Sequence, residues 1–135
     1  MKKVLKVYEI NGFSYSAYTK DKAEKKHKVF LNKEIDRKHI EWRNKIYERD
    51  DWTCQVCGTC YKDNVKGLNP MHILSKENYP QFRFDIMNGL TGCFYCHQNS
   101  KLSPHLDGFV FVHWLIKNKP EQYQYLINLL NKDGK

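Results

Sequence analysis

Two Cys-x-x-Cys pairs carry the clearest chemical signal in this 135-residue chain. The first pair is Cys54 and Cys57, and the second is Cys93 and Cys96. This spacing lets two thiolates reach one ion from a tight turn, and two such turns complete a tetrahedral zinc site. A redox dithiol or chance explains one pair better than two matched pairs. We therefore predict a structural zinc ion, with Cys60 left as a free thiol because its offset from Cys54 suits such a turn less well.

Three further residues have types that suit phosphodiester chemistry, and they occur in the order His72, Asn88 and His97. A histidine on a strand can take a proton from water, and an amide in the following loop can orient that histidine. A ligand on the next helix can hold a divalent cation that neutralises charge developing on a phosphate. Taken singly, each residue has a plainer explanation: a packed histidine, a turn asparagine before Gly89, and an extra zinc ligand beside Cys96.

The segment from Trp42 to about His105 resembles the HNH nuclease family, also called the ββα-metal or His-Me finger nucleases. The matching pieces are WRNKIYERDDWTCQVCG, LNPMHI, YPQFRFDIMNG and CFYCH, in this order, and they cover about half of the chain. The pattern is most similar to zinc-stapled HNH proteins of bacteria and phages. The resemblance implies a small ββα-metal core with a four-cysteine zinc site, and metal-dependent hydrolysis of DNA phosphodiester bonds.

The resemblance also implies a role for each matched residue. His72 corresponds to the general base that activates water, and Asn88 to the asparagine that positions the hairpin and, through it, the base. His97 corresponds to a ligand of the catalytic divalent ion, Mg²⁺ or Mn²⁺. The four paired cysteines correspond to the structural zinc ligands. Arg83 and Asp85 match the RFD stretch and are expected to fix the loop or to contact the backbone.

Met71 departs from the family pattern, in which Asp or His usually precedes the base and serves as a second metal ligand. A thioether is a poor ligand for a hard ion such as magnesium. Three outcomes stay open. His97 can hold the ion together with water and substrate oxygens, since magnesium commonly keeps several waters. His105, eight residues after His97, can supply a second ligand, or the site can be degenerate in a protein that only binds nucleic acid.

Local patterns predict the elements that position these residues. Alternating apolar residues on both sides of Asn11-Gly12 predict a β-ribbon. A basic helix is expected from near Lys22, and a second helical pattern runs from about 34 to 49. A strand is predicted over 68–74, a return over 88–92 and a helix starting within 98–102. The apolar run 109–116 is compatible with a strand or a helix, and a final helix follows Pro120.

These elements define an α+β fold, with an N-terminal ribbon and helices before the HNH core and helices after it. We predict a hairpin and basic helical extension over 1–41 and the nuclease core with C-terminal helices over 42–135, together one compact protein. His27 in the basic helix is expected to face water, and His113 in the apolar run is expected to lie in the core.

The formal net charge of +8 favours a polyanionic partner such as nucleic acid. Candidate phosphate contacts are the helix lysines and the basic residues Arg37, Arg43, Lys45 and Arg49. The expected partner is DNA, double-stranded or branched, and a homodimer is plausible because cutting two strands with one HNH site needs two copies. The N-terminus does not read as a secretory signal, and no apolar run approaches a membrane span. A cytoplasmic protein of a bacterial or phage-infected cell is expected.

The rival reading is a non-catalytic zinc-ribbon protein that binds nucleic acid through a degenerate HNH site. The two readings differ in the His72 constellation, which a pure binding protein does not require. The shape of the DNA, nicking as against double-strand cleavage, and a role in homing, packaging, recombination or defence all stay open at this level.

Overall fold

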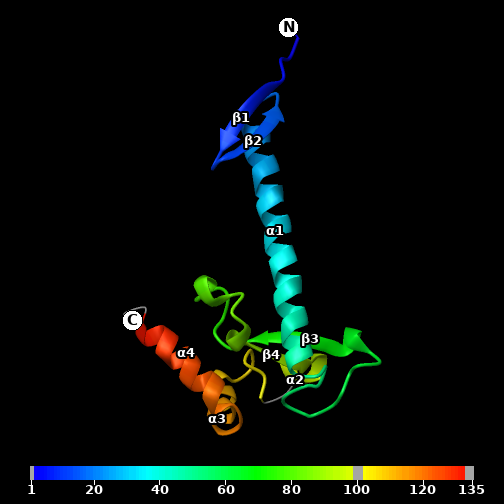
Figure 1. The fold of residues 1–135 in the computed structure, drawn as a ribbon, viewed down its shortest axis with the longest axis vertical. Helices are drawn as coiled ribbons and strands as arrows, with labels where there is room; N and C mark the ends of the chain where they lie inside the picture. The colour runs from blue at the N-terminus through cyan, green and yellow to red at the C-terminus, as the bar shows by residue number, and fades with distance from the viewer. Residues whose placement is uncertain (1, 99–101, 133–135) are drawn as a thin grey trace. The chain divides into compact units, whose positions relative to one another are not determined.

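The computed structural model describes residues 2–98 and 102–132, which form two small antiparallel sheets and four α-helices (Figure 1). The strands and α-helices, in chain order, are β1 (Lys6–Ile10), β2 (Phe13–Ala17), α1 (Lys20–Arg49), β3 (Leu68–His72), β4 (Gly89–Cys93), α2 (Phe94–Gln98), α3 (Gly108–Asn118) and α4 (Pro120–Lys132). The fold class is therefore α+β, as predicted. The chain divides into two compact units, Met1–Ile40 and Glu41–Lys135. Among the described residues, no helix combines the length and the apolar character that crossing a membrane requires.

The first unit contains the predicted ribbon. Strands β1 and β2 pair antiparallel, with Tyr8 opposite Tyr15. The turn between them places Asn11 and Gly12 at positive φ, 49° and 84°, a conformation that asparagine and glycine tolerate best. Helix α1 follows at once, and the hydroxyl of Thr19 accepts a hydrogen bond from the backbone N–H of Lys22 at its start.

His27 holds the ribbon against α1 and is buried, with 7% of its surface exposed, so the expectation that it faces water was wrong. Its Nδ1 lies 2.7 Å from the hydroxyl of Tyr15, and its ring lies beside those of Phe13 and Phe30. Packing of the aromatic rings between ribbon and helix favours burial of His27 more than the loss of its hydration opposes it. The loss is small because a histidine ring can be buried at little cost when its nitrogen is hydrogen-bonded.

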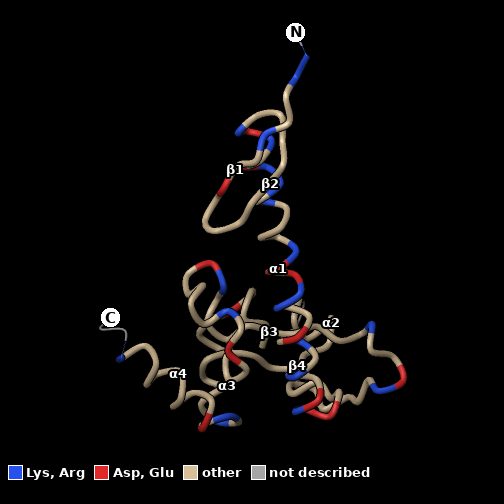
Figure 2. The backbone as a smooth tube through the Cα atoms, turned by 45° about the horizontal axis from the view of Figure 1, so that its top comes forward, with Lys and Arg blue, Asp and Glu red and all other residues tan. Residues whose placement is uncertain are grey.

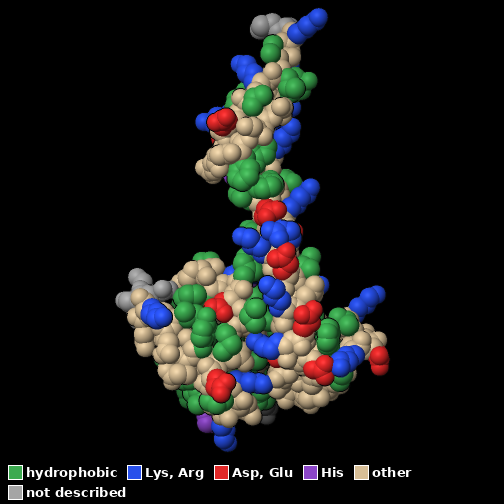
Figure 3. Space-filling model, viewed as in Figure 1, with side chains coloured by type: hydrophobic (Ala, Val, Ile, Leu, Met, Phe, Trp, Pro, Cys, Tyr) green, Lys and Arg blue, Asp and Glu red, His purple; other side chains and the backbone are tan. Residues whose placement is uncertain are grey.

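Helix α1 is one element of 30 residues, where the sequence patterns suggested two. No glycine or proline interrupts Lys20–Arg49, so nothing in the chain ends the helix between the two patterns. Basic residues lie before β1, at its first residue Lys6 and repeatedly along the first part of α1, whereas β2 has none (Figure 2). On this unit basic side chains lie among exposed hydrophobic side chains (Figure 3).

The second unit is built on the β3–β4 hairpin, in which Met71 pairs with Leu90 and His72 with Gly89. Met71 and Leu90 form a core with Phe111 and Leu115. On the other face, Trp42 and Ile46 of α1 pack directly on Gly89. A Cβ at Gly89 would lie 2.2 Å from the Cδ1 of Ile46, so only glycine lets the helix approach the strand this closely.

The C-terminal part resolves the ambiguity of the apolar run, which forms helix α3 (Gly108–Asn118). The carboxylate of Asp107 accepts a hydrogen bond from the backbone N–H of Val110 and caps the helix. Phe111 and Leu115 face the core, but His113 is exposed, which corrects its expected burial. The helix after the second cysteine pair is α2 (Phe94–Gln98), which begins earlier than the predicted start within 98–102.

Candidate functional site

The four paired cysteines converge, as the spacing predicted. The Sγ atoms of Cys54, Cys57, Cys93 and Cys96 all lie within 4.8 Å of one another. A tetrahedral zinc ion with Zn–S bonds of about 2.3 Å separates its sulfurs by roughly 3.8 Å, so this cluster has the size of a zinc site. Cys60 is exposed and lies outside the cluster. The four thiols can therefore hold one metal ion, and zinc fits them.

Backbone turns bring each pair of thiols together. The N–H of Gly58 donates to the carbonyl of Cys54 at 2.8 Å, and Gly58 has a positive φ of 76° that closes the first turn. In the second pair, the first turn of α2 directs the N–H of Cys96 at the Sγ of Cys93 at 3.4 Å. A strand end and a helix start thus supply the second turn.

The ionisation of these thiols also fits a cation site. Burial raises the pKa of Cys54 and of Cys96 above the usual 9.0. Burial opposes ionisation of Cys57 too, but hydrogen bonds from Thr59 and the neighbouring thiols lower its pKa to about 7. Thiolates brought within 4.8 Å of one another repel, and a divalent cation is the natural counter-charge.

His72 ends strand β3 and is held from two directions. Its ring stacks on that of Trp42, with centroids 4.2 Å apart and planes inclined by 9°. Its Nε2 lies 2.9 Å from the backbone carbonyl of Arg83. A carbonyl oxygen only accepts hydrogen bonds, so Nε2 carries the proton and the lone pair of the neutral ring is on Nδ1. This is the tautomer that a histidine base with a fixed orientation needs.

Asn88 is fully buried and ties together the loop between β3 and β4. Its Oδ1 accepts a hydrogen bond from the N–H of Leu74 at 2.6 Å. Its Nδ2 donates to the carbonyls of Leu74 and Phe82, both at 3.0 Å. Because Arg83 directly follows Phe82, the same clamp fixes the carbonyl that orients His72. The structure thus gives Asn88 a positioning geometry rather than a place in a simple turn.

His97 and His105 lie together, with their Nε2 atoms 2.8 Å apart. Ser103 supports the pair, because its buried hydroxyl bonds to the carbonyl of His97 and accepts from the N–H of His105 at 3.2 Å. Burial lowers the pKa of His97, and electrostatic interactions with His105 and His72 lower it further. His97 is therefore electrostatically coupled to both of the other histidines.

Met71 points away from this histidine group. Its side chain is fully buried in the core beside Leu90 and Phe111. Successive residues of a strand tend to face opposite sides, and here Met71 packs in the core while His72 stacks on Trp42. The position directly before His72 is therefore occupied by a core residue.

The RFD stretch fixes the loop through its backbone and through Asp85. The carbonyl of Asp85 accepts from the Nε1 of Trp42 at 2.8 Å, and its carboxylate accepts from the N–H of Met87 and the hydroxyl of Tyr125 at 2.9 and 2.7 Å. One residue thus connects α1, the 3-10 turn Ile86–Asn88 and α4.

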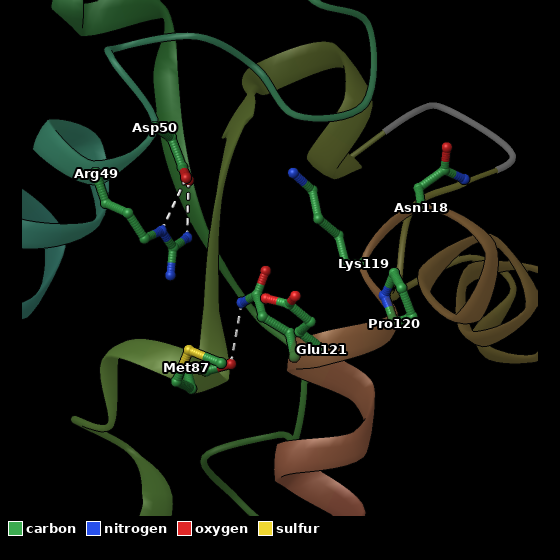
Figure 4. Close-up of a pocket in the computed structure, with 8 residues that line it drawn as sticks. Arg49, Asp50, Met87, Asn118, Lys119, Pro120 and Glu121 are labelled. Carbon is green, nitrogen blue, oxygen red and sulfur yellow. Dashed lines mark hydrogen bonds and ion pairs between the residues drawn. The ribbon is translucent and has the colours of Figure 1, made fainter.

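The predicted phosphate contacts differ in how they are engaged. Arg49 forms a bidentate pair with Asp50 at 2.8 Å (Figure 4). It also donates to the carbonyls of Ile86 and Gly89. Its guanidinium therefore braces β4, which leaves few donors for a phosphate. Arg37 pairs with Glu34 at 3.1 Å on the surface, Arg43 lies 6.0 Å from the ring of Tyr47, and Lys45 is exposed.

Sequence reasoning missed the supporting roles of Trp42, Ser103 and Tyr125. The contact of Trp42 with His72 joins residues 30 positions apart in the chain, so no local pattern predicts it. The YP-x-x-RFD-x-x-N pattern indicated a fixed loop, but no local signal shows which aromatic ring packs against that loop.

No protein family matches this chain, and neither a characterised protein nor a solved structure shows significant similarity to it.

Proposed function

We propose that this protein is a metal-dependent DNA endonuclease of the HNH type, stabilised by a structural zinc ion. The observation that carries the proposal is the histidine group. His72 is fixed by the Arg83 carbonyl within electrostatic reach of the His97–His105 pair. A base and an orienting amide at the loop end of a β-hairpin, with a ligand pair at and after the helix that follows the hairpin, suit hydrolysis of a phosphodiester.

In this proposal His72 takes a proton from water at Nδ1, the water oxygen attacks the phosphorus of the DNA backbone, and the phosphorus–oxygen bond to the leaving deoxyribose oxygen breaks. The Arg83 carbonyl holds the opposite ring nitrogen, so the base keeps one tautomer and one direction through the reaction. Asn88 acts indirectly as a positioning residue, because it holds the loop that carries this carbonyl. Trp42 fixes the plane of the ring by stacking.

His97 and His105 would hold the divalent cation. Two neighbouring ligands of an octahedral ion at about 2.1 Å lie about 3.0 Å apart, close to the 2.8 Å between their Nε2 atoms. A cation held there would neutralise charge at the phosphate and would stabilise the leaving oxygen. Two imidazoles favour a transition ion such as Mn²⁺ over Mg²⁺, which prefers oxygen ligands.

DNA is the proposed substrate because the chain is strongly basic and the reaction class acts on phosphodiesters. Double-stranded or branched DNA is favoured, and a homodimer would place two sites on two strands. The alternative is a DNA-binding protein without activity. The core position of Met71 favours this alternative, because it leaves two histidines as the protein ligands of the ion among the described residues.

Nicking of supercoiled plasmid with added Mn²⁺ or Mg²⁺ tests the proposal. His72→Ala should lower the rate by about a hundredfold to ten-thousandfold, the usual contribution of a general base. His113→Ala is the matched control, because His113 is an exposed histidine on α3 outside the site. Equal trace activity in wild type, His72→Ala and His113→Ala would leave the binding-protein alternative.

A further inference from the structure

The positive charge of the protein is concentrated away from the proposed catalytic residues. Residues 1–40 hold eleven of the 23 lysines and arginines but only five of the 15 acidic residues, and so carry +6 of the net +8. This unit contains none of the residues assigned to catalysis. A small unit with this density of one charge attracts polyanions in its own right.

A basic pocket lies where the ribbon meets the start of α1. Its volume is about 340 Å³, and it is lined by Lys3, Val4, Lys6, Tyr18, Thr19 and Lys22. Lys3 precedes β1, Lys6 opens β1, and Lys22 lies in the first turn of α1. Two segments of the chain, 3–6 and 18–22, therefore bring three lysines to one pocket.

These ammonium groups are not neutralised within the protein. In the part of the chain that the structure describes, no hydrogen bond or ion pair engages the Nζ of Lys3, Lys6 or Lys22. By contrast, the Nζ of Lys26, one turn along α1, donates to the carbonyl of Ser16. Three unpaired cations around one hollow repel one another, and an anion placed between them removes that repulsion.

The walls of the pocket suit a nucleotide better than a lipid surface. Tyr18 is 48% exposed and Val4 is 64% exposed, so an aromatic ring and an apolar side chain stand beside the cations. Bases stack on exposed aromatic rings while lysines contact the phosphates. Membrane-surface helices need a continuous apolar face, but residues 20–28 of α1 expose charged side chains on most sides.

We propose that the pocket of Lys3, Lys6, Lys22 and Tyr18 binds the phosphate backbone of DNA and captures it independently of the site at His72. The proposal deepens the proposed function, since it takes DNA as the polyanion. Its readout is binding, however, and requires no cleavage. The first 40 residues then anchor the substrate, and the second unit supplies the chemistry.

The test uses the full-length chain carrying His72→Ala, so that bound DNA is not cut. Lys3→Gln, Lys6→Gln and Lys22→Gln are combined in one variant. The control variant combines Lys25→Gln, Lys28→Gln and Lys38→Gln, which remove the same charge from exposed positions of α1 outside the pocket. Affinity for a labelled DNA oligonucleotide is measured by fluorescence anisotropy over a series of salt concentrations.

The pocket variant should lose affinity on the order of a hundredfold at low salt, and its salt slope should fall by about 3, since each phosphate contact contributes about 0.9. The control variant should lose less than about tenfold, because dispersed charges act only through long-range attraction. Lys22→Gln alone should lower the slope by about 1, and this single exposed change keeps the test valid if the triple variant misfolds.

Equal losses in the pocket and control variants, or an unchanged slope in Lys22→Gln, would overturn the proposal. Tight binding of wild type to anionic lipid vesicles, lost in the pocket variant while DNA binding persists, would overturn it in favour of a membrane. The outcome is separable from that of the nuclease proposal. If the wild-type protein does not cut DNA but the pocket variant binds DNA more weakly than the control variant, this inference stands and the nuclease proposal fails. If the wild-type protein cuts DNA but the pocket and control variants bind it equally well, the nuclease proposal stands and this inference fails.

Discussion

The surroundings of His72 decide which of its two nitrogens can act as a base. The Arg83 carbonyl engages Nε2, and the ring of Trp42 covers one face. Burial lowers the pKa of His72 below its ordinary 6.5, and the charges of Lys76 and Arg83 lower it further, against the opposing effect of the Arg83 carbonyl. The imidazole is therefore neutral, and able to accept a proton, at a pH where an exposed histidine is partly charged.

The lowered pKa of His72 predicts the acid limb of the pH–rate profile. Single-turnover cleavage should stay near its maximum as the pH falls to the ordinary value of 6.5 and should drop only below it. The same shift contributes stability that is fully present above pH 6.5 and is lost as the pH falls through the folded-state pKa. A rate that halves at a pH above 6.5 would contradict the assignment of His72 as the base.

His105 is the residue whose metal role depends most on the observed geometry. His105→Ala should raise the Mn²⁺ concentration for half-maximal cleavage by at least about tenfold, because one of two protein ligands is lost. The measurement is a metal titration of plasmid nicking, with His113→Ala as the control. A metal dependence equal to that of wild type would remove His105 from the site.

At the scale of elements, neighbouring residues of strand β3 face opposite sides of the β3–β4 hairpin, so one side packs in the core and the other carries the candidate site. Met71 faces Phe111 in the core, and His72 faces Trp42 on the other side. The loop between the strands would be free to move without its internal bonds, since its two short elements, Pro80–Phe82 and Ile86–Asn88, are single 3-10 turns. Asn88, at the end of the loop, stabilises it by hydrogen bonds to Leu74 near its start and to Phe82 in its middle.

Asn88→Asp should destabilise the protein by about 2–4 kcal/mol, since a buried carboxylate cannot donate to the carbonyls of Leu74 and Phe82. The free energy of unfolding is measured by urea denaturation. Asn78→Asp is the control, because Asn78 is an exposed residue of the same loop. Equal stability of the two variants would show that the clamp contributes little.

At the scale of the whole molecule, the chain divides charge and chemistry between its two units. The first has an excess of six positive charges, whereas the second holds the cysteine cluster and the histidine group with an excess of two. The cysteine cluster joins the turn after α1 to the end of β4 and the start of α2. A metal there closes a loop of about 40 residues and so restricts the unfolded chain.

Removal of the metal should therefore unfold the second unit rather than only reduce its activity. Elemental analysis should give one zinc per chain in wild type and in Cys60→Ser, but none in Cys93→Ser. The Tm of Cys93→Ser should fall by at least about 10 °C, since a loss of 3 kcal/mol shifts the Tm by roughly that amount. If the Cys93→Ser protein kept its zinc and its Tm, this cluster would not be the structural metal site.

The sequence by itself determined the features that depend on local spacing. The Asn11-Gly12 ribbon, the meeting of the paired cysteines and the existence of a strand containing His72 follow from turn chemistry, ligand spacing and hydrophobic alternation, although that strand ends two residues before the predicted end at 74. Only the tertiary structure decided the features that depend on distant contacts. In the folded protein His27 is buried, His113 is exposed and the side chain of Met71 lies in the core.

Tertiary packing also places His105 beside His97, and it makes Arg49 a hydrogen-bond donor to backbone carbonyls of the protein itself. The physical reason is common to these cases. A side chain's direction is fixed by local backbone geometry, but its partner is chosen by the packing of elements that lie far apart in the chain. Trp42 on His72 is such a contact, because a helix residue and a strand residue meet only once the second unit has folded.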